Sequence, residues 1–219
     1  LQMQEMVFVG NSLKDEPYTT ADAIAQYAEV QRGTVDRLIR THTEALQKLG
    51  KLGFEIRPLP KSKTGQSIKI YHLNEQQATL LITFLKNTSV VVAFKTELVR
   101  QFYAMRKELT KRRTYRAELK PTSRTLADTI KECTPSEHLH SWTYSNYFSL
   151  AHKAALGIST SKLKKQREIP NGANIPDYLN ADEIERVRKA ETAIMALLDV
   201  GMDYKQIKDT LLCKARRAA

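Results

Sequence analysis

Two short helical patterns, followed directly by two alternating segments, are the feature that most limits how this chain can fold. Residues 21–28 carry apolar side chains at helical spacing and follow Thr19 and Thr20, either of which can act as N-cap. A second helical pattern begins at Thr34, only about six residues after the first ends. Two short helices joined by a tight turn have the sequence form of a helix-turn-helix.

An alternation of apolar and polar residues replaces the helical pattern in residues 54–57 and again in residues 68–73. This period of two is typical of β-strands, so the two segments predict a hairpin. Its tip would hold the basic residues Lys61 and Lys63. A hairpin directly after a helix-turn-helix is a wing, and lysines at its tip would lie beside DNA phosphates.

Three further helical patterns belong to the first half of the chain. Residues 42–49 predict a third helix, and Asn74 opens a fourth, in which Gln77 completes the spacing of a capping box. After a break at Thr88, the longest pattern covers residues 90–108. Its buried stripe is expected to consist of Val91, Phe94, Leu98, Phe102 and Met105.

A run of basic residues and a proline mark the expected domain boundary. The basic run is residues 111–116, and Pro121 is expected to break the chain. We therefore expect residues 1–108 to form a winged helix-turn-helix domain that ends in a long helix. Residues 109–123 would be a basic linker, and residues 124–219 a helical domain for assembly or partner binding.

The C-terminal half carries only helical patterns, at residues 126–133, 142–156, 159–168 and 180–201, and again from Asp203 onward. Its clearest helix is expected to begin at Asn180, with Glu183 at the capping-box position. A cluster of aromatic residues is interpreted as core, not as a binding surface: Trp142, Tyr144, Tyr147 and Phe148. The predicted fold class is mainly α with a small β hairpin.

The chain is basic, which favours an acidic partner such as nucleic acid. It has 35 Lys and Arg against 24 Asp and Glu, a net charge of +11 over 219 residues. Residues 1–120 hold 20 basic and 12 acidic residues, and residues 121–219 hold 15 and 12. Most of the excess charge therefore lies in the half that contains the predicted helix-turn-helix.

The predicted second helix supplies the candidate DNA contacts. Four residues near its start are expected to reach base edges, because arginine pairs with guanine and glutamine with adenine: Gln31, Arg32, Thr34 and Arg37. Arg40, Lys61 and Lys63 are expected to contact phosphates. A helical pair in a small α-rich domain also occurs without DNA contact, and the basic wing argues against that interpretation.

No catalytic motif is found, so we expect no enzyme activity, no cofactor and no metal. One group resembles a metal site, but it lacks the second half of a zinc spacing and is interpreted as a solvated loop: Cys133, Glu137, His138 and His140. Cys133 and Cys213, the two cysteines, are expected to be free thiols. No apolar run approaches the roughly 20 residues of a membrane span, so we expect a cytoplasmic protein without membrane contact.

Residues 17–108 resemble the N-terminal domain of the Rha family of phage regulatory proteins. The resembling features are Thr19-Thr20 with Ile24-Ala25, Val35 with Leu38-Ile39, residues 70–74 with the sequence IYHLN, Phe94-Lys95, Leu98, Phe102 and Met105. One departure is Ala28-Glu29, where such domains often have glycine in the turn between the helices. The C-terminal half resembles, more loosely, modules attached to phage antirepressors, in residues 144–157 and after Tyr178-Leu179.

The two resemblances together imply a phage or prophage transcription regulator in a bacterial host cell. Its basic N-terminal domain would bind double-stranded DNA, and its C-terminal part would mediate assembly. We expect a homodimer, because one helix reads few bases and the stripes on residues 90–108 and 184–198 offer more apolar surface than one small domain needs. The alternative is an antirepressor that binds and inactivates a repressor protein.

Overall fold

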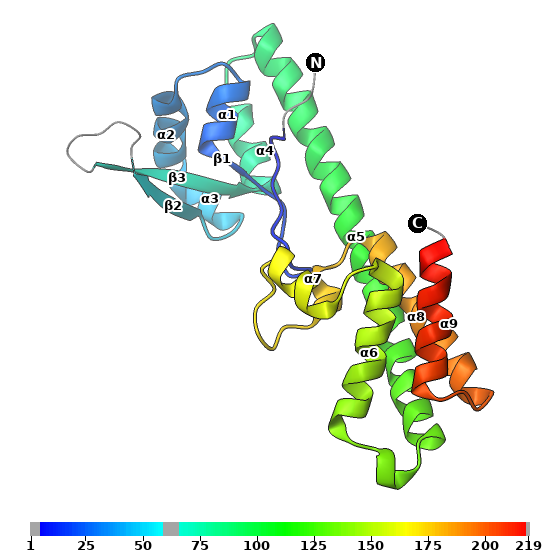
Figure 1. Ribbon diagram of the computed structural model, residues 1–219. Helices are drawn as coiled ribbons and strands as arrows, with labels where there is room; N and C mark the ends of the chain where they lie inside the picture. Colours follow the sequence, from blue (N-terminus) through cyan, green and yellow to red (C-terminus); the bar gives the residue numbers. More distant parts are fainter. Residues whose placement is uncertain (1–4, 59–65, 218–219) are drawn as a thin grey trace. The chain divides into compact units, whose positions relative to one another are not determined.

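The computed structural model describes residues 5–58 and 66–217, which group into two units (Figure 1). The first unit is built from the described residues between 5 and 108, except 11–13. The second is built from residues 11–13 and 109–217. The protein is mainly helical, with one small antiparallel sheet in the first unit.

The first unit contains three strands and the helices between and after them. These elements are β1 (Tyr18–Thr20), α1 (Ala21–Tyr27), α2 (Arg32–Thr41), α3 (Thr43–Lys48), β2 (Gly53–Pro58), β3 (Ser67–Asn74), α4 (Glu75–Thr83) and the first half of α5 (Ser89–Cys133). The sheet has the order β1-β3-β2 and is antiparallel throughout. Thr19 lies opposite Leu73, and Ile56 lies opposite Lys69. The predicted hairpin is therefore confirmed, and a short strand that the sequence analysis did not predict pairs with its second strand.

Local capping fixes where two of these helices begin. The Thr20 hydroxyl accepts a hydrogen bond of 3.1 Å from the Ala23 amide at the start of α1. At the start of α4 the Asn74 side chain accepts from the Gln77 amide at 2.8 Å, and the Asn74 amide donates to the Gln77 side chain at 3.1 Å. This reciprocal pair is the predicted capping box.

The turn between α1 and α2 is shorter than predicted. Helix α2 begins at Arg32, two residues before the predicted Thr34, and Gln31 is its N-cap. Glu29 has a φ of +52°, a conformation that glycine adopts without strain. The Val30 amide donates to the Ala25 carbonyl at 3.0 Å, as in a Schellman motif. The turn is thus closed by a left-handed glutamate at a position where glycine would be free of strain.

The core of the first unit combines residues from α1 to α5 and the sheet. Its buried residues include Ile24, Val35, Ile39, Leu46, Leu73, Leu81, Val91, Phe94, Leu98 and Phe102. Both α1 and α4 contact β1 and β3 (Figure 1). The predicted stripe of α5 is therefore used inside this unit. Because it is already buried, it gives no surplus apolar surface from which to infer a homodimer.

Helix α5 continues without a break through Pro121 to Cys133, so the prediction of a break is wrong. Residues 109–123, expected to be a basic linker, are helical and begin the second unit. A proline inside a helix costs about 3 kcal/mol or more, because its ring clashes and its amide donor is missing. Leu119 and Leu126, on either side of Pro121, are fully buried in the second unit, and this packing outweighs the penalty.

The second unit consists of helices. Besides α5 these are η1 (Ser136–His138), α6 (Ser141–Leu156), α7 (Thr160–Gln166), η2 (Ile175–Tyr178), α8 (Ala181–Asp199) and α9 (Tyr204–Arg217).

Asn180 and Glu183 form the predicted capping box at the start of α8. Glu183 also accepts two hydrogen bonds, of 2.8 and 2.5 Å, from the Arg167 guanidinium. Burial raises the pKa of Glu183, but the bonds from Arg167 and from the Asn180 amide outweigh it and leave that pKa below its ordinary value.

Two hydrophobic clusters fill the second unit. One joins α5, α6, α8 and α9 through Leu126, Ile130, Leu150, Ile194 and Ile207. The other joins α5, α7 and α8 through Leu119, Leu163, Leu179, Ile184 and Val187. Tyr147 is buried, but Trp142 is 59% exposed, which corrects the expectation that the aromatic cluster is all core.

The described helices include none with an apolar stretch of the length needed to span a bilayer. Cys133 and Cys213 are both exposed and free, as predicted. Within residues 5–58 and 66–217 no three His, Cys, Asp or Glu side chains gather as a metal site requires.

Candidate nucleic-acid interface

Helix α2 presents one face to the core and the other to solvent. Val35 and Ile39 are fully buried, whereas Arg37 and Arg40 are exposed. Opposite faces of a helix lie about two residues apart in sequence, and this spacing explains the separation. Among the described residues neither exposed arginine forms an ion pair with a carboxylate. Both guanidinium groups are therefore available to an anionic partner.

The start of α2 holds the other three residues predicted to contact bases. Gln31 is exposed and makes no side-chain capping bond. Thr34 is half-buried in the first turn. Arg32 is half-buried as well, and its guanidinium is held by the protein itself.

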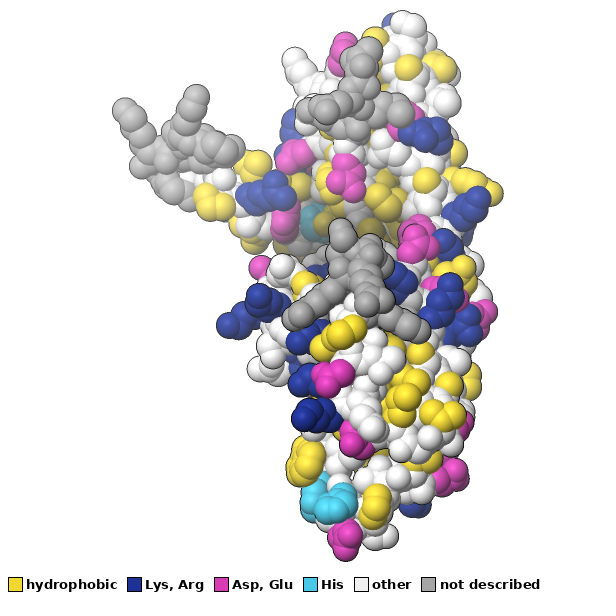
Figure 2. All heavy atoms as spheres, turned by 45° about the vertical axis from the view of Figure 1, so that its right-hand side comes forward, with side chains coloured by type: hydrophobic (Ala, Val, Ile, Leu, Met, Phe, Trp, Pro, Cys, Tyr) yellow, Lys and Arg dark blue, Asp and Glu magenta, His cyan; other side chains and the backbone are white. Residues whose placement is uncertain are grey.

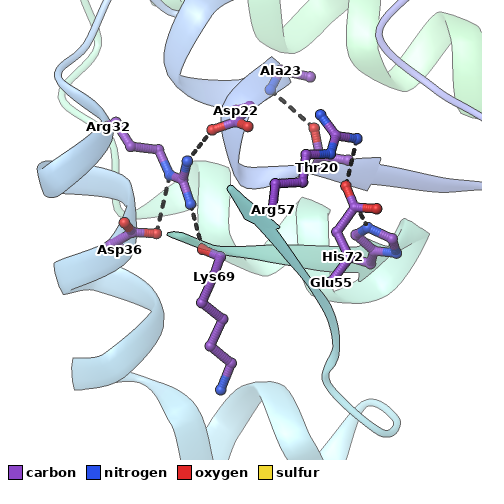
Figure 3. A network of polar contacts seen from close by, with 9 residues as sticks. All are labelled: Thr20, Asp22, Ala23, Arg32, Asp36, Glu55, Arg57, Lys69 and His72. Carbon is purple, nitrogen blue, oxygen red and sulfur yellow. Dashed lines mark hydrogen bonds and ion pairs between the residues drawn. The ribbon is translucent and has the colours of Figure 1, made fainter. Parts of the chain in front are cut away.

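Arg32 joins α1, α2 and β3 (Figure 3). Its Nη1 pairs with Asp22 of α1, and its Nε donates to Asp36 of α2 at 3.3 Å. Its Nη2 donates to the main-chain oxygen of Lys69 in β3 at 2.6 Å. The arginine is 26% exposed and all three groups converge on it. The geometry therefore makes Arg32 a link between the helical pair and the sheet.

Strand β3 contributes a basic residue to the same region. Lys69 is exposed, and its Nζ lies 3.8 Å from the ring centroid of Phe54 and 4.9 Å from that of Tyr71. The two rings hold the ammonium group by cation–π attraction. A hollow of about 410 Å³ lies between α2 and β3, lined by Arg32, Asp36, Arg40, Ile68, Lys69 and Tyr71.

The hairpin also exposes apolar and paired charged side chains. Phe54 is 50% exposed and Ile56 is 66% exposed. Arg57 pairs with Glu55 across 2.5 Å, and Glu55 lies 3.6 Å from His72 (Figure 3). Arg57 is therefore partly neutralised by its neighbour.

Lys61 and Lys63, the predicted phosphate contacts of the wing, lie outside the described residues. The expectation about them stays a prediction from the sequence.

Net charge does not locate a binding surface in this protein. On the face shown in Figure 2, Lys and Arg side chains occur together with Asp and Glu side chains. The local arrangement on α2 and β3 is more informative, because there the exposed side chains Arg37, Arg40 and Lys69 have no carboxylate partner among the described residues.

Sequence reasoning missed two parts of this site. Lys69 stands between Ile68 and Ile70 in the alternation that predicted β3, so its outward direction could have been inferred. The contact of Arg32 with Asp36 has the spacing of four that favours a helical ion pair. The contacts of Arg32 with Asp22 and Lys69 depend on the tertiary fold, and no local sequence pattern predicts them.

The site and its sheet define a small α and β unit within a mainly helical chain. Residues 19–107, which cover this unit from β1 into α5, match the family model described as Phage regulatory protein Rha. The match supports the resemblance seen in the sequence and suggests a phage regulator. No curated protein matches this chain.

Proposed function

We propose that the first unit binds duplex DNA sequence-specifically as a winged helix-turn-helix, and that the protein regulates phage transcription. The order of elements supports this assignment. A short strand precedes two helices, a hairpin follows them, and the strand pairs with the second strand of the hairpin. In this arrangement α1 and α2 form the helix-turn-helix, and β2 and β3 form the wing.

The exposed face of α2 is the observation that carries the proposal. Arg37 and Arg40 reach solvent there, and Arg40 lines the same hollow as Lys69 of the hairpin strand. Placed in a major groove, Gln31, Thr34 and Arg37 would meet base edges, while Arg40 and Lys69 would meet phosphates. Arg32 would act as a positioning residue that holds α2 against β3, since its guanidinium already has three partners.

Gly33 adds independent support. It lies in the first turn of α2, and a Cβ placed there would meet no atom of the residues that the structure describes within 4 Å. The fold therefore does not require glycine, although glycine destabilises a helix by about 0.5–1 kcal/mol relative to alanine. A site where another molecule approaches the backbone closely would account for it.

The proposal is tested by selecting binding sites from fragments of the genome that encodes the protein. We expect a defined site, bound more tightly than random duplex by about a thousandfold. Affinity for both DNAs should fall as salt rises, because phosphate contacts release counterions. Equal affinity for all fragments would contradict specific reading. Capture of a repressor protein without any DNA binding would support the antirepressor alternative.

The regulator is also proposed to act as a homodimer, because a two-fold dimer doubles the number of bases that α2 reads. Light scattering of the free protein and the length of its DNA footprint test this. A 25.0 kDa particle that protects a single half-site would contradict it.

A further inference from the structure

A cavity of about 370 Å³ lies among α5, α6, α7, η2 with the residues just before it, and α8, within the second unit. It is lined by Arg116, Lys120, Ser123, Arg124, Phe148, His152, Lys164, Ala173, Asn174, Ile175, Pro176 and Glu191. Its volume is within the lower part of the range for small-molecule sites, about 300–1,000 Å³. It lies outside the unit to which we assign DNA binding.

The lining is strongly positive. It contains four basic residues and one acidic residue. Arg116 is committed to Asp177, to which its Nε donates at 2.7 Å. Among the described residues, Lys120, Arg124 and Lys164 form no ion pair with a carboxylate. Three cations around one small cavity without partners favour an anionic ligand.

A buried histidine in the wall has an unused ring nitrogen. His152 is 7% exposed, and its Nδ1 lies 2.7 Å from the Phe148 carbonyl oxygen of its own helix. Burial lowers the pKa of His152, while the bond to Phe148 raises it, and the net direction is downward. The ring is therefore neutral at physiological pH, with the Nδ1 proton donated to Phe148 and Nε2 as an acceptor. Nε2 is buried, and no group in the described part of the chain donates a hydrogen bond to it, so this acceptor lacks a donor.

Glu191, the acidic residue in the wall, carries less than a full negative charge on average at neutral pH, which reduces its repulsion of an anion. Glu191 is 1% exposed and accepts a hydrogen bond of 2.8 Å from the Ser123 hydroxyl. Burial raises its pKa to about 7, against the lowering effects of Ser123 and Arg116. A substantial share of the molecules thus carries a neutral carboxyl here at neutral pH.

One part of the wall is apolar. Phe148, Ile175 and Pro176 line the same cavity as the cations. An aromatic side chain beside small apolar groups suits a flat ring, because rings stack on one another.

We propose that this cavity binds a small phosphorylated ring compound of the nucleoside monophosphate class. Lys120, Arg124 and Lys164 hold the phosphate, and an N–H of the base donates to Nε2 of His152. Phe148 contacts the ring. Each of the three features is needed: an inorganic anion leaves Nε2 without a donor, and an uncharged nucleoside leaves the three cations without a partner.

The test measures binding of AMP, adenosine and inorganic phosphate to the full chain by calorimetry at neutral pH. We expect AMP to bind with a Kd of about 1 mM or tighter. Adenosine and phosphate should each bind at least about tenfold more weakly, because each lacks a set of contacts. The double variant Lys120→Met/Arg124→Met should lose at least about tenfold in AMP affinity. Lys131→Met, an exposed lysine of the same helix outside the cavity, serves as the matched control and should bind like the wild type.

A second readout follows His152 directly. The imidazole ¹⁵N resonance of Nε2 should shift when AMP is added and not when phosphate is added, because only AMP supplies an N–H donor. The proposal is overturned if none of AMP, GMP, CMP and UMP binds at about 10 mM, a concentration about tenfold above the weakest expected Kd. Equal affinity for phosphate and AMP would show an anion site only. Undiminished AMP binding by the folded double variant would also contradict it.

Discussion

Arg32 and Lys69 are 37 positions apart in the sequence, yet the guanidinium of the first donates a 2.6 Å hydrogen bond to the main-chain oxygen of the second. This bond joins helix α2 to strand β3, the pair with Asp22 joins α2 to α1, and the bond to Asp36 lies within α2. The spacing between a helix and its neighbouring hairpin decides whether both can reach DNA at once. We therefore propose that Arg32, first predicted to contact a base, sets this spacing.

Replacing Arg32 with alanine should destabilise the first unit. The variant loses hydrogen bonds that involve a charged group, and water offsets part of their free energy because the Arg32 side chain is 26% exposed. We expect a loss of about 1–3 kcal/mol in the free energy of unfolding, measured by urea denaturation. Arg40→Ala, on the exposed face of the same helix, is the control and should unfold like the wild type. Equal stability of the Arg32 and Arg40 variants would remove the linking role.

Gly33→Ala should separate stability from function. Alanine favours the helix over glycine, so the variant should be more stable by about 0.5–1 kcal/mol. If DNA approaches the backbone at this point, the same methyl group should weaken affinity by about tenfold, equivalent to about 1.4 kcal/mol. Thermal unfolding and fluorescence anisotropy on the selected site measure the two effects. If the variant is more stable and binds DNA like the wild type, DNA does not approach the backbone closely at Gly33.

Removing Lys61 and Lys63 together should weaken binding to all duplexes alike. Each phosphate contact contributes about 0.9 to the slope of log K against log salt, so the slope should become less steep by about 1.8. Titrations with one specific and one random duplex, at several salt concentrations, measure this. An unchanged slope would exclude both lysines from the interface.

Because of Glu191, the free energy of unfolding should decrease as pH rises. In the unfolded chain this carboxyl ionises near the ordinary glutamate value of 4.5, whereas burial raises its pKa in the folded chain to about 7. Between these values the folded state holds a proton that the unfolded state has released, so stability decreases by up to about 3 kcal/mol and then levels off. Glu191→Gln should lack this decrease, and the exposed Glu132→Gln should keep it, when urea unfolding is followed from pH 4.5 to 8. A parallel pH dependence in the wild type and Glu191→Gln would contradict the assignment.

Local signals predicted the helical and strand elements well, because capping and periodicity act over a few residues. Asn74 with Gln77 and Asn180 with Glu183 form the predicted capping boxes. The start of α2 was misplaced by two residues, since Thr34 resembled a cap while Gln31, which makes no capping bond, takes that position.

Features that depend on tertiary packing were not predictable. From the neighbouring sequence alone, Pro121 predicts a helix break, but the buried side chains of Leu119 and Leu126 anchor the helix on both sides of it. Trp142 belongs to an aromatic run that suggests core, yet it lies near the start of α6, where it is mostly exposed. The cavity around His152 collects residues from four α-helices, from η2 and from the loop before η2, and no sequence pattern brings them together.

If the exposed face of α2 reads DNA sequence, Arg37→Ala should remove part of the protein's preference for its own site. Arg37 is exposed, so its loss should leave the fold intact, while a bidentate arginine–guanine pair is worth about 1–3 kcal/mol of discrimination. The measurement is the ratio of affinities for the selected site and random duplex, with Arg100→Ala of α5 as a control that also removes one positive charge. We expect Arg37→Ala to lower this ratio by about 5- to 150-fold and Arg100→Ala to leave it unchanged. An unchanged ratio in the folded Arg37→Ala protein would contradict the claim.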